Sequence, residues 1–393
     1  MSFRYVKLGS LFDITSGGTP SRKNKAYYEN GDIPWVKTGD LKNMYLVDAD
    51  EYITQQALNE SSAKLFPKGT VLIAMYGATI GNCSILSINA ATNQACAAFK
   101  PNNRIIPEFL YYYLTSIKEK LISLAVGGAQ PNISISILRN IEIPLLTINQ
   151  QERVVSILNK SKELIDKRKA QIEALDQLTQ SVFLEMFGDP ATNPKKWPMG
   201  FIKDLALKTQ YGTSKKASED TGKYPILRMN NITYQGHWDL TDLKYVDLDE
   251  KEVEKYLVHK GELLFNRTNS KELVGKTAVY RFEKPMAFAG YLVKVIPNEK
   301  ANAEFISAYL NSKYGKSILF SMAKNIVGMA NINAEELKSI KIYIPPKQLQ
   351  DQFAEIVQKI ESQRELFKKG LVELEKNFNS LMQRAFKGEL FND

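Results

Sequence analysis

Cysteine and histidine are scarce in this chain. Its 393 residues include two cysteines, Cys83 and Cys96, and two histidines, His237 and His259. Four such residues cannot supply two separate metal sites, and neither pair has the close spacing of a zinc knuckle. We therefore predict no metal site and interpret all four residues as packing or surface positions.

Long apolar runs are also absent. No stretch approaches the ~18 consecutive apolar residues of a membrane span, and the opening segment MSFRYVKLGS lacks the apolar core of a signal peptide. We expect a cytoplasmic protein without a membrane partner.

Motifs of methyl-transfer and nucleotide-binding enzymes are missing. An adenine methyltransferase needs an Asn/Asp-Pro-Pro-aromatic tetrad and a glycine-rich turn for the methyl donor, and neither occurs. Gly275-Lys-Thr resembles the end of a phosphate-binding loop, but the first glycine of that motif would fall at Ser270. We predict that the chain is not an enzyme by itself and binds no cofactor.

A long helical pattern is present, and it occurs twice. Residues 149–186 and 349–386 carry side chains at alternating spacings of four and three, the seam pattern of a coiled coil. The first predicted seam is Val154, Leu158, Ser161, Ile165, Arg168, Ile172, Leu175, Thr179, Val182 and Met186. The second is Phe353, Val357, Ile360, Arg364, Phe367, Leu371, Leu374, Phe378, Leu381 and Ala385.

Start and stop signals bracket both helices. Thr147 and Gln150 form a predicted capping box before the first, and Gly188 and Gly388 follow the two ends, where a left-handed residue is favoured. A helix of roughly 35 residues would be about 50 Å long and must bury its seam. We expect the two helices to pair; the alternative is two bundle helices that never meet.

Arg168 and Arg364 interrupt the seams, either to set the register or to face a partner subunit.

The segments before each helix also repeat in order. Gly31-Asp-Ile-Pro-Trp-Val-Lys is echoed by Gly222-Lys-Tyr-Pro-Ile-Leu-Arg, and Lys68-Gly-Thr-Val-Leu-Ile by Lys260-Gly-Glu-Leu-Leu-Phe. Residues 107–116 match 303–312, and the motif beginning at Gly128 loosely matches the one at Gly328. Ordered recurrence indicates a tandem duplication.

The duplication defines the predicted organisation. We expect an α+β fold in which two globular domains with short-stranded sheets are separated by two long antiparallel coiled-coil helices. Strands are predicted at 71–75, 84–88 and 95–99, and a helix at 107–116. The predicted ranges are 1–148 (first domain), 149–188 (first spacer helix), 189–197 (linker), 198–345 (second domain), 346–388 (second spacer helix) and 389–393 (tail).

The ordered motifs resemble the specificity subunit of type I restriction-modification enzymes over essentially the whole chain. The resemblance is carried by Gly18-Thr-Pro-Ser, Gly31-Asp-Ile-Pro-Trp, the turn from Gly77 to Gly81, Asn266-Arg-Thr-Asn with Gly275-Lys, Ile143-Pro and Ile344-Pro-Pro, and the helix ends Phe187-Gly-Asp and Lys387-Gly-Glu. The second half departs from the pattern, because Gly212-Thr-Ser-Lys-Lys stands where Gly-Thr-Pro-Ser is expected.

The resemblance implies two target-recognition domains, each reading one half of a split sequence in double-stranded DNA. It also implies two modification (methyltransferase) subunits that carry S-adenosylmethionine, and optional motor-nuclease restriction subunits. The net charge of +9 agrees with a polyanionic partner. The other function class that we keep open is a protein-interaction scaffold whose positive charge is incidental.

The candidate DNA-binding residues lie in polar loops of both halves. Arginine suits guanine, asparagine and glutamine suit adenine, and lysine suits phosphate; the alternative for each is a solvated loop or turn cap. The first half offers Thr19, Ser21, Arg22, Lys23, Lys37, Thr38, Tyr76, Thr79, Asn82, Asn93 and Gln94, and the second Thr213, Lys215, Lys216, Arg228, Asn230, Asn231, Arg267, Asn269, Ser270 and Lys276. Arg267 is the preferred base reader, whereas Asn132 and Asn333 are predicted to cap short helices.

Overall fold

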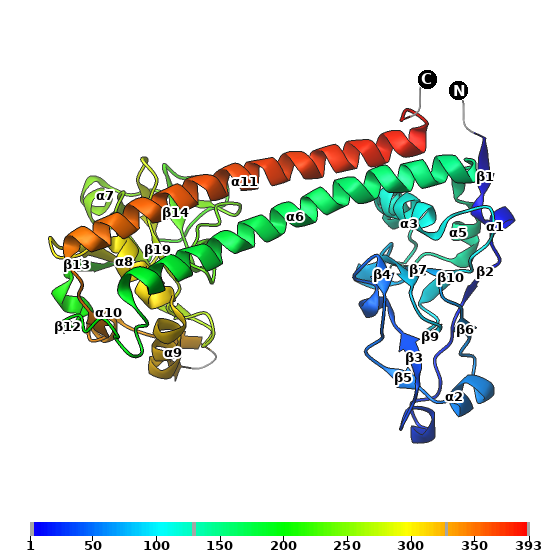
Figure 1. The fold of residues 1–393 in the computed structure, drawn as a ribbon, viewed down its shortest axis with the longest axis horizontal. Helices are drawn as coiled ribbons and strands as arrows, with labels where there is room; N and C mark the ends of the chain where they lie inside the picture. The colour runs from blue at the N-terminus through cyan, green and yellow to red at the C-terminus, as the bar shows by residue number, and fades with distance from the viewer. Residues whose placement is uncertain (1–3, 128–130, 327–328, 391–393) are drawn as a thin grey trace. The chain divides into compact units, whose positions relative to one another are not determined.

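The computed structural model describes residues 4–127, 131–326 and 329–390. Contacts group the chain into two compact units (Figure 1). Unit 1 comprises residues 1–168 and 370–393, and unit 2 comprises residues 169–369. Each contains one globular domain and part of both long helices, α6 (Ile148–Phe187) and α11 (Lys347–Lys387). The repeat motifs at Gly128 and Gly328 begin outside the described residues.

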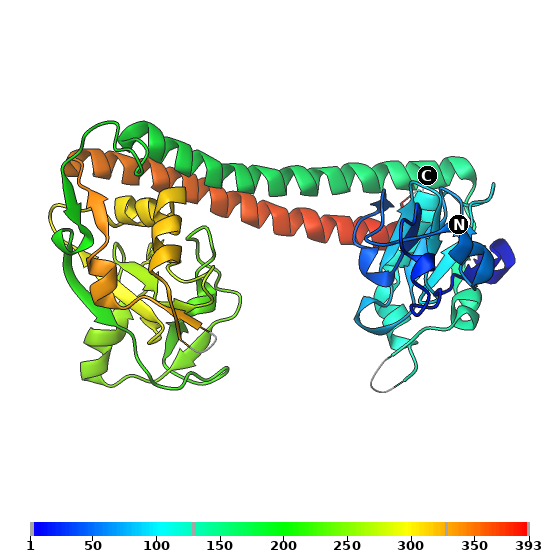
Figure 2. The ribbon, with the colours of Figure 1, turned by 90° about the horizontal axis from the view of Figure 1, so that it is seen from below.

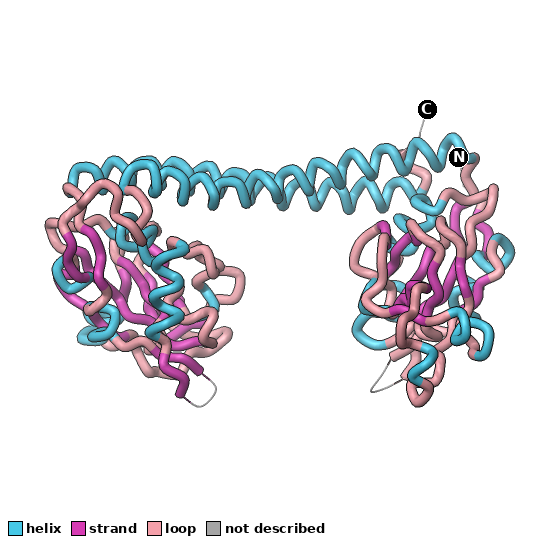
Figure 3. Tube along the Cα trace, turned by 60° about the horizontal axis from the view of Figure 1, so that its bottom comes forward, coloured by secondary structure: helices cyan, strands magenta, loops and turns pink. Residues whose placement is uncertain are grey.

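The domain of unit 1 contains two small sheets, with strand orders β2-β10-β7-β8-β4 and β5-β3-β9-β6, and the β1–β11 ribbon. The strands are β1 (Tyr5–Lys7), β2 (Ile14–Ser16), β3 (Ile33–Val36), β4 (Tyr45–Leu46), β5 (Tyr52–Ile53), β6 (Leu65–Phe66), β7 (Val71–Ala74), β8 (Cys83–Leu86), β9 (Ala90–Thr92), β10 (Cys96–Phe99) and β11 (Glu142–Pro144). The short helices are α1 (Leu8–Leu11), α2 (Gln55–Glu60), α3 (Pro107–Ser116), α4 (Lys118–Ser123) and α5 (Ile135–Asn140). Figure 3 shows the mixture of short strands, short helices and long loops.

The sequence of strand β7, residues 71–74, is a continuous apolar run. Val71 and Ile73 belong to one core cluster, and Leu72 and Ala74 belong to another. Successive side chains of a strand point to opposite faces, so β7 is buried on both sides and needs apolar residues at every position. The strands predicted at 71–75, 84–88 and 95–99 are present within two residues at each end, and the predicted helix 107–116 is α3.

The domain of unit 2 repeats this topology, except that β4 has no counterpart in its first sheet. Its sheets have the orders β13-β21-β17-β19 and β15-β14-β20-β16, and β12 pairs with β24. In both copies the second sheet contains one parallel pair, β3–β9 and β14–β20. The strands are β12 (Met199–Phe201), β13 (Ala206–Tyr211), β14 (Tyr224–Leu227), β15 (Lys244–Val246), β16 (Leu257–Val258), β17 (Leu263–Asn266), β19 (Thr277–Val279), β20 (Met286–Phe288), β21 (Leu292–Pro297) and β24 (Lys341–Tyr343). The tandem duplication is confirmed.

Unit 2 adds a three-stranded sheet, β18-β23-β22, formed by β18 (Thr268–Asn269), β22 (Lys324–Ile326) and β23 (Met329–Asn331). Its short helices are α7 (Glu250–Tyr256), α8 (Ala303–Asn311), α9 (Lys313–Met322) and α10 (Ala334–Lys338). One-turn 3₁₀ segments are η1 (Lys25–Tyr27), η2 (Thr38–Asp40) and η3 (Gly77–Thr79) in unit 1, and η4 (Ile202–Asp204) and η5 (Met229–Asn231) in unit 2.

A buried glutamine joins each long helix to its own domain. Gln151 is 0% exposed and donates to the carbonyls of Leu146 (3.0 Å) and Arg104 (2.8 Å), while its Oε1 accepts from the backbone of Ile106 (2.8 Å). Gln350 makes the same three bonds, to Pro345, Lys300 and Asn302. A buried amide is stable only when its donors and acceptor are paired, so each glutamine ties the start of its helix to the segment before α3 or α8.

The long helices pair antiparallel, and every predicted seam position is buried or half-buried. In unit 2, Phe183 and Phe187 near the end of α6 contact Phe353 near the start of α11, with ring centroids 5.8 and 5.4 Å apart. In unit 1, Met382 and Phe386 at the end of α11 share a core with residues at the start of α6. The helices lie side by side in two perpendicular views (Figures 1 and 2). The alternative of helices that never meet is therefore wrong.

The expected helix ends are also confirmed. Thr147 and Gln150 exchange backbone and side-chain hydrogen bonds (3.0 and 3.3 Å), and Gly188 and Gly388 have φ angles of 82° and 84°. The helices extend one or two residues beyond the helical patterns at 149–186 and 349–386, and their ends lie within one residue of the spacer ranges 149–188 and 346–388. Neither they nor any other helix in the described ranges has the long apolar stretch that crossing a bilayer requires.

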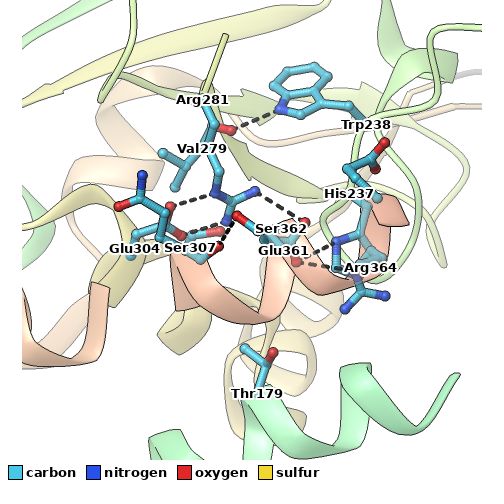
Figure 4. A network of polar contacts seen from close by, with 12 residues as sticks. Thr179, His237, Trp238, Val279, Arg281, Glu304, Ser307, Glu361, Ser362 and Arg364 are labelled. Atoms are coloured by element: carbon cyan, nitrogen blue, oxygen red, sulfur yellow. Dashed lines mark hydrogen bonds and ion pairs between the residues drawn. The ribbon is translucent and has the colours of Figure 1, made fainter. Parts of the chain in front are cut away.

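Arg364 occupies a seam position because it is paired with carboxylates. Its guanidinium is buried and lies 2.5 Å from Asp176 of α6 and 3.2 Å from Glu361. His237, from the globular domain, lies 2.7 Å from Asp176 and 3.5 Å from Glu361. Figure 4 shows that Arg281 continues this network from Glu361 to Glu304 of α8. The network joins both long helices to the domain of unit 2.

Arg168, the other arginine at a seam position, lies against a glycine of the facing helix. It is half-buried and faces Gly370 of α11, where a Cβ atom would collide with its guanidinium. Glycine is a poor helix former, so its presence in the middle of α11 has a packing reason. Both arginines therefore have a place inside the helix pair, as a role in register requires.

The network predicts a pH dependence of stability. Burial alone would lower the pKa of His237, but the hydrogen bonds to Asp176 and Glu361 outweigh it and raise the pKa above 6.5. Burial would raise the pKa of Glu361, but His237, Arg281 and Arg364 lower it to about 2. The contribution of His237 to the free energy of unfolding is complete below pH 6.5 and is lost as the pH rises through the raised pKa of the folded state. The glutamate contribution is complete above pH 4.5 and is lost as the pH falls toward 2.

We therefore expect the free energy of unfolding to be largest between pH 4.5 and 6.5 and to fall on the alkaline side. His237→Gln should flatten the alkaline fall when urea midpoints are measured across this range. His259→Gln is the matched control, because its side chain is 57% exposed. An alkaline fall of unchanged steepness in His237→Gln would contradict this assignment.

Candidate nucleic-acid interface

The glycine-rich motif of unit 1 packs against its tryptophan motif. Trp35 Nε1 donates to the carbonyl of Gly18 (3.1 Å), and a Cβ at Gly18 would collide with Ser62. Thr19, the next residue, contacts the amide of Gln94 through its hydroxyl. These contacts place the exposed residues Thr19 and Gln94, which are 75 positions apart in the chain, on one surface.

Arg22 and Lys37 share a carboxylate on this surface. Both form ion pairs with Glu51, and the Lys37 ammonium is 2.5 Å from it. The Arg22 guanidinium lies 4.4 Å from the Tyr28 ring centroid and 5.2 Å from that of Trp35. The shared carboxylate holds both cations, and the ring contacts further fix the position of Arg22. Ser21 and Lys23 beside them are exposed, and Thr38 is half-buried.

A second loop of unit 1 contains Tyr76, which is 45% exposed. The turn that follows uses Gly77 and Gly81 at φ angles of 63° and 80°, and the Thr79 hydroxyl donates to the Tyr76 carbonyl (3.0 Å). Asn82 accepts from the Lys118 ammonium (2.8 Å). Asn93 accepts from the backbone of Ala95 (3.2 Å), as a turn cap does.

The predicted cap role of Asn132 is wrong. Asn132 lies in bridges with Tyr76 and Val126, and the N-cap of α5 is Ser134, whose hydroxyl accepts from Ile137 (3.2 Å). The helix begins later than expected because residue 132 is needed for backbone pairing. Asn333 does cap α10, accepting from Glu336 (2.9 Å).

Several candidates of unit 2 have partners inside the domain. Asn231 is 2% exposed and donates to the carbonyls of Asp239 and Asp242 (2.8 and 3.1 Å). Arg228 binds the Asp242 carboxylate (2.8 Å), and Lys215 pairs with Glu252. Thr213 is buried, whereas Lys216 and Asn230 are exposed. Buried groups with such partners hold the loops in shape.

Arg267 is framed by side chains from other segments of the domain. Its guanidinium lies 4.9 Å from the Tyr211 ring centroid and donates to Asn331 Oδ1 (3.3 Å), and Asn331 in turn donates to Thr268 (2.8 Å). Within the described ranges no carboxylate pairs with it. Asn269 and Ser270 continue the same loop, and Lys276 returns to donate to the Met229 carbonyl (2.8 Å). The loop after β17 therefore lies against the turn Met229–Asn231.

Sequence reasoning did not identify Tyr211 and Asn331 as the frame around Arg267. Asn331 lies in the motif that begins at Gly328, so the loose internal repeat was the available signal. Tyr211 ends strand β13 and carries no local signal at all, because its ring meets Arg267 only in the folded domain.

Comparisons with known proteins agree with this twofold architecture. The family model described as "Type I restriction modification DNA specificity domain" matches residues 2–174 and again residues 194–376. The specificity subunit of type I restriction enzyme MjaIX from Methanocaldococcus jannaschii is 25% identical, over 98% of this chain and 92% of that protein. The EcoKI specificity subunit of Escherichia coli K12 is 22% identical, over 95% and 86%.

Two solved structures share the fold. The S subunit of a type I restriction-modification system from M. genitalium has a TM-score of 0.54 and 19% identity, and the match covers 98% of this chain and 96% of that one. A chain from a structure titled for complex assembly and conformational transition of the type I R-M system has a TM-score of 0.64 and 17% identity, covering 99% and 98%. With both halves matched by one family model, the chain belongs to the type I restriction-modification DNA specificity family and is a DNA sequence-recognition subunit.

Proposed function

We propose that each domain of this chain reads one half of a split DNA target and that the chain itself catalyses no reaction. The observation that carries this proposal is one sheet topology built twice with different loops upon it. The loop after β7 is Tyr76-Gly-Ala-Thr-Ile-Gly, whereas the loop after β17 presents Arg267 on Tyr211 and Asn331. One scaffold with two unlike surfaces suits a target with two unlike halves.

Two modification subunits are the proposed partners, and they would supply S-adenosylmethionine and the methyl-transfer chemistry. Motor-nuclease restriction subunits would join as further partners, and the assembly would act in the cytoplasm on the chromosome. Support comes from the solved relative whose title concerns assembly of the type I complex. The target-recognition loops supply the base contacts. The exposed lysines supply phosphate contacts, whose strength depends on salt.

Mapping of methylated adenine in the genome, with and without this chain, tests the proposal. Methylation should vanish from one bipartite sequence when the chain is removed and return when it is restored. An unchanged methylation map in cells that contain both modification and specificity genes would refute it.

Arg267→Ala should weaken binding to the mapped target by about 1–3 kcal/mol and relax base preference in one half-site only. Arg267→Lys keeps the charge but not the two-pronged donor, so it should also lose the preference. Affinities for duplexes with single base changes in each half measure both effects. An equal loss on every sequence would instead identify a phosphate contact.

A further inference from the structure

A basic groove lies beside α9 in unit 2. It has a volume of about 630 Å³ and includes Lys271, Lys313 and Lys316 among its lining residues. Tyr234 and Phe320 also line it and are 48% and 46% exposed. The three lysines come from two separate segments, the loop after β18 and the helix α9. The groove is thus a product of the tertiary fold.

Lys316 is the unusual member of this groove. Its ammonium is buried, has no hydrogen-bond partner among the described residues, and lies 4.6 Å from the Tyr234 ring centroid. Burial, together with the nearby Lys276, lowers the pKa of Lys316 to about 8. Burying a cation without a neighbouring anion costs free energy. We therefore interpret the Lys316 ammonium as part of a binding site for an anion.

The carboxylate of Glu272, which lines the groove, is held by local hydrogen bonds. Its pKa is lowered chiefly by its own backbone N–H and by the Ser270 side chain, and less by Lys271. Lys271 lies 4.5 Å from the Phe320 ring centroid. The groove therefore combines several cations with one carboxylate that is held by local hydrogen bonds.

We propose that this groove binds phosphodiester oxygens of the DNA strand whose bases face the Arg267 loop. The inference rests on the proposed function. Lys271 follows Arg267 by four residues on one loop, and phosphate contacts that flank base contacts set the position of a protein on a duplex. Lys313 and Lys271 supply the direct contacts to phosphate oxygens, and the buried ammonium of Lys316 adds its positive charge from below the groove surface. The rings of Tyr234 and Phe320 lie against the ammonium groups of Lys316 and Lys271 respectively.

The first test is the salt dependence of DNA binding by the full-length chain. The double variant Lys313→Gln, Lys316→Gln is compared with Lys208→Gln, Lys359→Gln, which removes the same charge at exposed positions elsewhere. With the mapped target duplex over a series of KCl concentrations, the slope of log K against log[KCl] should fall by about 0.9 per groove lysine. The control slope and the preferred sequence should not change.

A double variant whose slope equals the control slope, while wild type binds DNA in a salt-dependent way, would overturn the groove assignment alone. A wild-type chain with no preference for any duplex would remove the proposed function, and the groove assignment with it.

The second test needs no variant and so does not depend on folding of a mutant. Lysine acetylation of the wild-type chain is mapped by mass spectrometry with and without target duplex. Lys271 and Lys313 should be protected by DNA, and Lys208 should not. Equal protection by inorganic phosphate alone would indicate a free-phosphate site, and protection by modification subunits without DNA would indicate a protein contact. Either result would overturn the proposal.

Discussion

Asp176→Ala is expected to lower the free energy of unfolding by about 3–5 kcal/mol, because it leaves a buried charge without its main partner. Asp176 binds both the Arg364 guanidinium (2.5 Å) and His237 (2.7 Å), and the Arg364 side chain is 2% exposed. Glu361 remains near Arg364 but is also shared with His237 and Arg281. Urea unfolding of the full-length chain, followed by tryptophan fluorescence, measures the loss.

Asp166→Ala is the matched control on the same helix. Asp166 pairs with Lys162 one turn away at 3.0 Å, and both side chains are about half exposed. Exposed pairs of this kind contribute about 0.3–0.5 kcal/mol. The double variant Asp176→Leu, Arg364→Met should recover most of the loss, because it removes the buried charge together with its partner. A loss for Asp176→Ala no larger than for Asp166→Ala would show that the network is not a structural requirement.

Insertion of two residues between Lys169 and Ala170 is expected to abolish sequence-specific DNA binding. Two residues turn the rest of α6 by roughly 200°, at ~3.6 residues per turn. In unit 1 the start of α6 must keep Val154 and Leu158 against the end of α11, and in unit 2 Phe183 and Phe187 must keep facing Phe353. One continuous helix cannot satisfy both contacts after such a rotation.

Four inserted residues provide the control, because they exceed one turn by only about 40° and leave the seam roughly aligned. The four-residue variant should unfold cooperatively and bind duplex DNA, whereas the two-residue variant should lose both properties. Duplex binding and urea unfolding are measured on the same preparations. Wild-type behaviour of the two-residue variant would disprove the paired-seam account of α6 and α11.

Local signals in the sequence determined the long helices, the duplication and the strand runs. Spacings of four and three identify a buried stripe because side chains three and four apart share a helix face. Helix α3 was predicted with its observed limits because Pro107 is favoured in a first helical turn. The ordered motifs determined the family. Each of these signals is a short local pattern, and the duplication is visible because such patterns recur in the same order, which is why a single sequence reveals them.

Only the tertiary structure decided what the polar residues do. Arg168 and Arg364 look alike in the sequence, yet one faces Gly370 and the other is buried against Asp176. The sequence predicts only a packing or surface role for His237, but this residue joins the domain to both long helices. Tyr211 and Asn331 meet Arg267 from strands that are far apart in the chain. A charged or amide side chain takes its role from whichever partner the folded chain brings within hydrogen-bond distance, and that partner has no fixed spacing in the sequence.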